Sequence, residues 1–129
     1  MDEIYPGTCI LIPKPNHSTR HLWIVLTEPH EQTLEIVIAN LTSYRQGSDT
    51  TVIIQPGSHS FVRHTTVVYY ADARFVSVTA LKQLLKLPNY EFHDDCSKQL
   101  LKLIQCGLLN SKFTPNNIKR YCKQAFNSA

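Results

Sequence analysis

The fold of this chain is decided by two apolar runs, His21-Leu-Trp-Ile-Val-Leu-Thr27 and Leu34-Glu-Ile-Val-Ile-Ala39. Both are shorter than an ordinary helix and rich in isoleucine and valine, which suit a pleated and buried surface. The polar segment between them, residues 28–33, contains a proline and predicts a connecting loop. Because a strand buried on both faces loses the alternation of polar and apolar residues, we expect these runs to form the middle of a sheet.

Polar side chains stand at the ends of both runs. Arg20 and His21 open the first run, and Asn40, Thr42 and Ser43 follow the second. Antiparallel pairing brings the start of one strand beside the end of the next. We therefore expect these five residues at one rim of the sheet, and we expect a functional site there.

The remaining pattern predicts an α+β protein in two parts. Further short β-rich runs predict strands over residues 7–12, 50–55, 66–70 and 74–78. So many short strands indicate a small barrel or a strongly curled antiparallel sheet, which we place over residues 1–78. Helical spacing begins at residue 79 and predicts three helices, over 79–86, from 94 or 95 to about 105 with Gly107 as C-cap, and from Thr114 onward. They form a helical C-terminal extension, residues 79–129, packed on or beside the barrel.

Composition narrows the class of protein. The chain has 129 residues, of which 43% are hydrophobic and 18% charged, as in a folded domain and unlike a disordered chain. No apolar run reaches the roughly 18 residues of a membrane span, so no membrane partner is expected. The acidic start lacks the apolar stretch of a signal peptide, and we expect a cytoplasmic protein. The four cysteines are far apart and match neither a zinc site nor a disulfide framework, so we expect no metal or cofactor.

Charge is distributed unevenly along the chain. Residues 1–81 carry five basic and seven acidic side chains, whereas residues 82–129 carry eight basic and three acidic ones. A mildly basic C-terminal part fits RNA or an acidic protein as partner, and it fits a solvated helical surface equally well.

A dense polar segment, His59-Ser-Phe-Val-Arg-His64, is the second candidate for chemistry. Two imidazoles with Arg63 between them supply a general base, a general acid and a cation, which suits cleavage of an RNA phosphodiester through its 2′-hydroxyl. On a regular strand His59 and His64 would point to opposite faces, so they converge only if the segment bends. Metal binding by His21, His59 and His64 is a rival use, but no local spacing typical of zinc is present.

The order of these segments resembles the MazF/PemK family of toxin endoribonucleases. The resemblance lies in Gly7-Thr-Cys-Ile, in a polar loop before His21-Leu-Trp-Ile-Val-Leu-Thr27, in Val37-Ile-Ala-Asn-Leu-Thr-Ser43 and in Thr51-Val-Ile-Ile-Gln-Pro-Gly57. It covers residues 7–78 and rests on pattern and order more than on identical residues. It implies a small SH3-like β-barrel with added helices, metal-independent cleavage of single-stranded RNA, and neutralisation by an antitoxin peptide lying across the same surface.

The resemblance also assigns roles to residues. The family's catalytic arginine, at the start of its second strand, corresponds to His21, with Arg20 one residue earlier, and the family's next residue, a proline, corresponds to Leu22. Its catalytic hydroxyl corresponds to Thr42 or Ser43. Since a shift of one residue moves a side chain to the other face of a sheet, either His21 has taken over proton transfer or the cleft has lost activity.

Two hypotheses follow. The first is a toxin of a type II toxin–antitoxin system that cleaves RNA and has single-stranded RNA, an antitoxin and a second copy of itself as partners. Its catalytic residues are then His21, Thr42 and His64, and its RNA-binding residues are Arg20, Ser43, Arg45, His59 and Arg63. The second hypothesis is a non-catalytic SH3-like module that binds a peptide or RNA, because such barrels host many unrelated functions.

Overall fold

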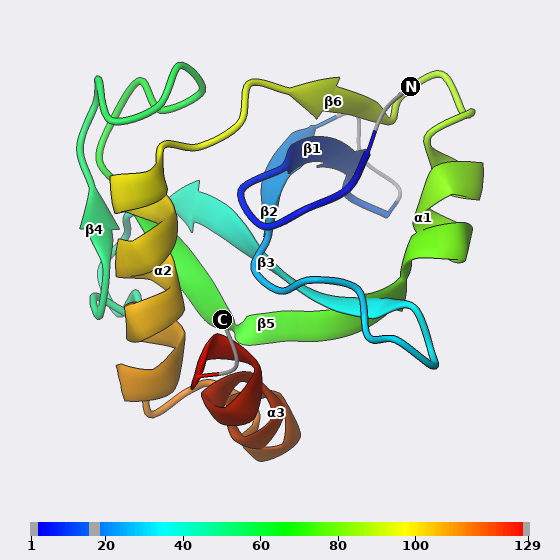
Figure 1. Ribbon diagram of the computed structural model, residues 1–129. Coiled ribbons are helices and arrows are strands. Elements are labelled where there is room, and N and C mark those ends of the chain that lie inside the picture. Colours follow the sequence, from blue (N-terminus) through cyan, green and yellow to red (C-terminus); the bar gives the residue numbers. More distant parts are fainter. Residues whose placement is uncertain (1–2, 16–18, 128–129) are drawn as a thin grey trace.

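Six antiparallel strands form one curled sheet in the order β4-β5-β3-β2-β1-β6 (Figure 1). This computed structural model describes residues 3–15 and 19–127. The strands are β1 (Cys9–Pro13), β2 (Arg20–Val25), β3 (Glu35–Ser43), β4 (Ile53–Ile54), β5 (Thr66–Ser77) and β6 (Glu91–His93), and the helices are α1 (Val78–Leu84), α2 (Lys98–Asn110) and α3 (Asn116–Asn127). The expected α+β fold, a small curled sheet followed by helices, is confirmed. The sheet curls into a half-barrel.

The two apolar runs lie at the centre of the sheet, as predicted. β2 and β3 pair antiparallel, with Trp23 opposite Asn40. Along β2, Leu22 and Ile24 belong to the hydrophobic core on one face, whereas Trp23 and Val25 belong to the core on the other. Because side chains alternate between the two faces, a slip of one residue would place each of these side chains in the wrong core. Burying one such side chain contributes about 1.5–3 kcal/mol, so the slip would cost much of the stability of both cores.

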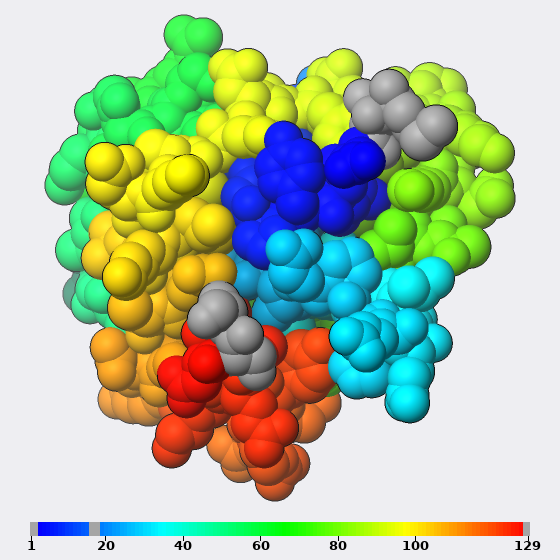
Figure 2. All heavy atoms as spheres, in the orientation of Figure 1, coloured from blue at the N-terminus to red at the C-terminus, as the bar shows by residue number. Residues whose placement is uncertain are grey.

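Helices cover both faces of the sheet. α2 and α3 pack on the face that carries Leu22 and Ile24, and α1 packs through Leu81 on the face that carries Trp23 (Figure 1). In the space-filling view the N-terminal segment, drawn in blue, fills the space between α2 and α1 (Figure 2). Within residues 3–15 and 19–127, no helix is both long and apolar enough to span a bilayer.

Residues 71–73, expected to separate two strands, instead form a bulge inside the continuous strand β5. Tyr69 lies opposite Asn40 and Arg74 opposite Ile38, so five steps along β5 match two steps along β3. A bulge absorbs extra residues and bends a strand without ending its pairing. The two predicted strands are therefore one.

The C-terminal part contributes a strand as well as helices. β6 pairs with β1, and three residues are too few for a sequence pattern to reveal. α2 begins later than expected, because Ser97 rather than Asp94 or Asp95 is the N-cap and accepts a hydrogen bond from the backbone N–H of Leu100. Gly107, expected to end this helix, lies inside it.

Candidate functional site

A hollow of about 260 Å³ opens where β2 begins and β3 ends. We call it the rim hollow. It gathers six of the eight residues that the sequence predicted as functional, namely Arg20, His21, Thr42, Ser43, Arg45 and His64. Lys14, Thr19, Leu41, Phe61 and Thr66 complete its lining. The expected meeting of the two strand ends at one rim therefore occurs.

The imidazole of His21 is held in one tautomer. Its Nδ1 lies 3.1 Å from the carbonyl oxygen of Leu41. Because a carbonyl oxygen only accepts, Nδ1 must carry the proton of this hydrogen bond, and in the neutral ring Nε2 keeps a free lone pair. Extending the β2–β3 register by two residues places Thr42 opposite His21. A proton acceptor and a hydroxyl thus lie on neighbouring strands beside the same hollow.

A second imidazole pairs with the other hydroxyl of the rim. His64 Nε2 lies 2.7 Å from Ser43 Oγ; His64 is exposed and Ser43 is partly exposed. A neutral His64 that carries its proton on Nδ1 accepts the serine proton at Nε2, whereas a His64 protonated at Nε2 donates to the serine oxygen. The pair can therefore take up or release a proton at the hollow.

The charged side chains that line the rim hollow are basic. Lys14, Arg20 and Arg45 line it, and none of the described lining residues is an aspartate or a glutamate. Arg20 makes an ion pair with Glu91, at 2.8 Å, in which both side chains are partly exposed. Such a surface pair is worth at most about 1 kcal/mol, so Arg20 can turn to an incoming anion at little cost. The hollow favours a phosphate.

His59 and Arg63 lie apart from this group. His59 is buried, donates from Nε2 to the carbonyl oxygen of Asp94 at 2.7 Å and accepts at Nδ1 from the backbone N–H of Phe61 at 3.0 Å. Both ring nitrogens are therefore used within the protein. Arg63 is exposed and does not line the rim hollow. The structure thus does not bring His59 together with His64.

Next to the rim hollow lies a larger one, of about 410 Å³, which we call the Trp23 pocket. Lys14, His21 and Thr42 line both. The rest of the Trp23 pocket includes the aromatic residues Trp23, Tyr69 and Tyr90 and the polar residues Asn40, Asp72 and Arg74. Sequence reasoning missed most of these, because the bulge in β5 that brings Asp72 beside Asn40 has no local signature.

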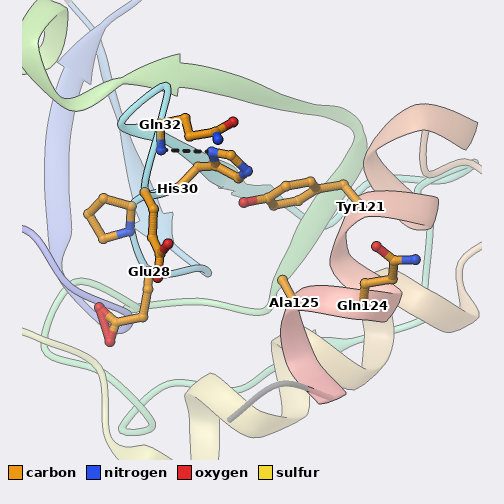
Figure 3. Close-up of a pocket in the computed structure, with 8 residues that line it drawn as sticks. Glu28, His30, Gln32, Tyr121, Gln124 and Ala125 are labelled. Carbon is orange, nitrogen blue, oxygen red and sulfur yellow. Dashed lines mark hydrogen bonds between the residues drawn. The ribbon is translucent and has the colours of Figure 1, made fainter.

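A third hollow, of about 550 Å³, lies between the loop after β2 and α3 (Figure 3). Tyr121 of α3 points toward His30 of the loop, and their rings are 6.2 Å apart. His30 Nδ1 accepts from the backbone N–H of Gln32. Glu28 and Glu31 give this hollow a negative lining, which repels phosphate and makes it a poor place for RNA.

Metal binding is the rival use of His21, His59 and His64. Among residues 3–15 and 19–127, no three histidine, cysteine, aspartate or glutamate side chains lie close enough to hold an ion.

Comparisons of the chain with protein-family models, with curated proteins and with solved structures find no match. Fold and site together define an α+β protein with a cationic hollow, bearing two histidines, at the rim of a curled sheet.

Proposed function

We propose that this protein is a MazF/PemK-like toxin of a type II toxin–antitoxin system, a metal-independent endoribonuclease that acts on single-stranded RNA. The observation that supports this most is the rim hollow, whose described lining gathers two imidazoles, four hydroxyls and three cationic side chains and includes no carboxylate. Cleavage of RNA through its own 2′-hydroxyl needs a base, an acid and positive charge at one place.

The reaction would use these groups in the following way. His21 Nε2 takes the proton of the 2′-hydroxyl, and the 2′-oxygen forms a bond to phosphorus as the bond to the 5′-oxygen breaks. Protonated His64 gives its Nε2 proton to the departing 5′-oxygen. The products are a 2′,3′-cyclic phosphate and a free 5′-hydroxyl, while Lys14 and Arg45 stabilise the charge that develops on the phosphate.

The positive rim also suits the partners of such a toxin. A single strand of RNA presents phosphates to it, and an acidic antitoxin peptide that covers it would complement its charge and block cleavage. We place the protein in the cytoplasm, beside its RNA substrate, and expect it to act as a homodimer. Sedimentation of the purified chain, alone and with an acidic partner encoded beside it, measures both associations.

The proposal is tested with labelled single-stranded RNA and the variants His21→Ala and His64→Ala. Loss of a general acid or base lowers a rate by about 10²–10⁴-fold, so we expect each variant to lose at least a hundredfold in cleavage while circular dichroism stays unchanged. His30→Ala removes an imidazole from the acidic hollow instead and is the matched control, with its cleavage unchanged. Arg45→Ala is expected to weaken RNA binding, and Arg63→Ala is its control.

Three results would overturn the proposal. Full cleavage by both histidine variants removes the assignment of the chemistry. Cleavage that a chelator abolishes removes the metal-independent mechanism. Binding of RNA without any cleavage leaves the second hypothesis, a non-catalytic SH3-like module that binds RNA or a peptide.

A further inference from the structure

The Trp23 pocket contains a buried acceptor without a partner. Asn40 is 4% exposed, and its side-chain nitrogen donates to Asp72 Oδ2 at 3.0 Å. This bond fixes the orientation of the amide, because a carboxylate only accepts. The amide oxygen, Asn40 Oδ1, is buried and no described group donates to it. Leaving such an oxygen unpaired costs free energy, which an N–H arriving with a ligand would recover.

Aromatic rings and a guanidinium line the same pocket as this acceptor. Arg74 lies over the ring of Trp23, 5.1 Å from its centroid, and is also paired with Asp72. Tyr69, directly opposite Asn40 in the sheet, is 47% exposed, and Tyr90 lines the same pocket. The Arg74 side chain is 56% exposed, so it can swing off the indole and open the way to Asn40. A flat ring would then find stacking partners on its faces and an acceptor at its edge.

The position of the pocket identifies the kind of flat ring. Lys14, His21 and Thr42 are shared with the rim hollow, which is lined by the basic residues Lys14, Arg20 and Arg45. A nucleotide is the ligand that holds a flat heteroaromatic ring one sugar away from a phosphate. Its ring edge carries N–H donors, and its phosphate suits the neighbouring cations. A volume of about 410 Å³ is within the range of small-ligand pockets, roughly 300–1,000 Å³.

We infer that the Trp23 pocket is a nucleobase subsite, in which Asn40 Oδ1 accepts an N–H of the base edge and Tyr69 stacks on the ring. That the base belongs to an RNA strand rests on the proposed function. The strand then enters the pocket with one base and lays the adjoining phosphate in the rim hollow.

Trp23 is the only tryptophan of the chain, so its fluorescence reports binding directly. We titrate the four ribonucleoside monophosphates, and ribose 5-phosphate as the ligand without a base. The tightest nucleotide is then compared with its analogue in which the edge N–H is methylated. Because the lost donor leaves a buried acceptor unpaired, we expect the analogue to bind about tenfold more weakly. Equal affinities, or equal binding of ribose 5-phosphate, would overturn the subsite.

Two variants sharpen this comparison. Asn40→Leu removes the amide at similar size, so it should bind the nucleotide and its methylated analogue equally well. The ligand comparison in the unaltered chain stands whether or not this variant folds. Tyr69→Leu changes a half-exposed residue without touching the core, and we expect it to weaken nucleotide binding severalfold. Unchanged affinity in Tyr69→Leu would remove the stacking role.

A single-stranded 2′-deoxy oligonucleotide separates the strand from a free nucleotide. It offers bases and phosphates but no 2′-hydroxyl, so it cannot be cleaved by the proposed chemistry. If the base comes from a strand, the oligonucleotide should bind at least about tenfold more tightly than the mononucleotide, because its further phosphates and bases add contacts along the basic rim. Equal affinities would overturn the strand as source. Failure of cleavage together with intact methyl discrimination would sink the nuclease while leaving the base subsite in place.

Discussion

Gly107 lies inside α2, where the helix meets β5. A Cβ at this position would overlap Tyr70 Oη and a methyl group of Val52. Tyr70 is fully buried, and its hydroxyl donates to the carbonyl oxygen of Ile104 at 2.8 Å. The tyrosine therefore cannot move aside without losing this bond. The missing side chain at position 107 sets how closely helix and sheet approach.

We predict that Gly107→Ala destabilises the protein. At an ordinary position inside a helix this change would stabilise by about 1 kcal/mol, but overpacking costs about 1–3 kcal/mol and the broken tyrosine bond about 1 kcal/mol more. The free energy of unfolding in urea should fall by about 1–3 kcal/mol. Lys102→Ala, on the exposed face of α2, is the control and should change it little. A more stable Gly107→Ala would show that the close approach carries no strain.

The residues that sequence reasoning placed at the site follow a simple rule. Arg20, His21, Thr42 and Ser43 are at the ends of two runs whose antiparallel pairing was predictable, so their meeting at one rim was predictable too. His59 shows the limit of such reasoning. Its ring donates a hydrogen bond to the carbonyl oxygen of Asp94, 35 residues away. No pattern in the neighbouring sequence predicts that partner. Gly107 shows another limit, because a glycine after a helical stripe signals a C-cap and a close packing contact alike.

At the scale of elements, the sequence predicts a strand or helix correctly where the segment is long and uninterrupted. β2 and β3 were identified because a strand buried on both faces is a plain apolar run. The sequence does not reveal β6 because it has only three residues, and the bulge in β5 reads as a separation between two strands because small and acidic residues are common to both. These short features are held in place by neighbours distant in sequence, so they depend on the finished sheet.

Asp49 connects the loop before β4 to the end of α2. Its Oδ2 accepts from the Ser111 hydroxyl at 2.6 Å, and its Oδ1 accepts from the backbone N–H and the hydroxyl of Thr51 at 3.0 and 2.6 Å. Burial alone would raise the pKa of this carboxyl, but the hydrogen bonds from Ser111 and Thr51 outweigh it and hold the pKa below its usual value. The ionised form is therefore favoured in the folded state.

We predict that Asp49→Asn lowers the free energy of unfolding at pH 7 by about 1–2 kcal/mol, since the amide nitrogen cannot accept from Ser111. A carboxyl whose folded pKa is lowered contributes stability above its unfolded pKa, near 4, and loses it as the pH falls through the lower folded value. The gap between the two proteins should therefore close in acid. Urea titrations at pH 7 and pH 3 measure it, with the exposed Glu31→Gln as control. A gap that is as large at pH 3 as at pH 7 would contradict a role for the charge.

At the scale of the whole molecule, the helices and the sheet share their cores. Leu22 and Ile24 of β2 pack with Ile104 and Leu108 of α2 on one face, while Trp23 of the same strand packs with Leu81 of α1 on the other. β6, which follows α1 in the chain, completes the sheet beside β1. The sequence places a boundary at residue 78, where the spacing of apolar residues becomes helical. The first helix does begin there, but both hydrophobic cores include residues from either side of the boundary.

We predict that the sheet and the helices unfold together. The fluorescence of Trp23 reports the α1 face of the sheet, and far-ultraviolet circular dichroism reports mainly the helices, so the two signals should follow one urea transition with the same midpoint and slope.

A chain truncated after residue 97 loses α2 and α3 and uncovers β2 and β3, and we expect it to aggregate because the exposed apolar face is continuous. If the helical signal disappears at lower urea than the Trp23 signal, and the truncated chain stays folded and monomeric, the helices are an appendage on an independent barrel. Coincident transitions would instead mean that binding at the rim, where β2 and β3 meet, stabilises α2 and α3 as well, because a ligand that binds the folded state shifts the whole cooperative unit.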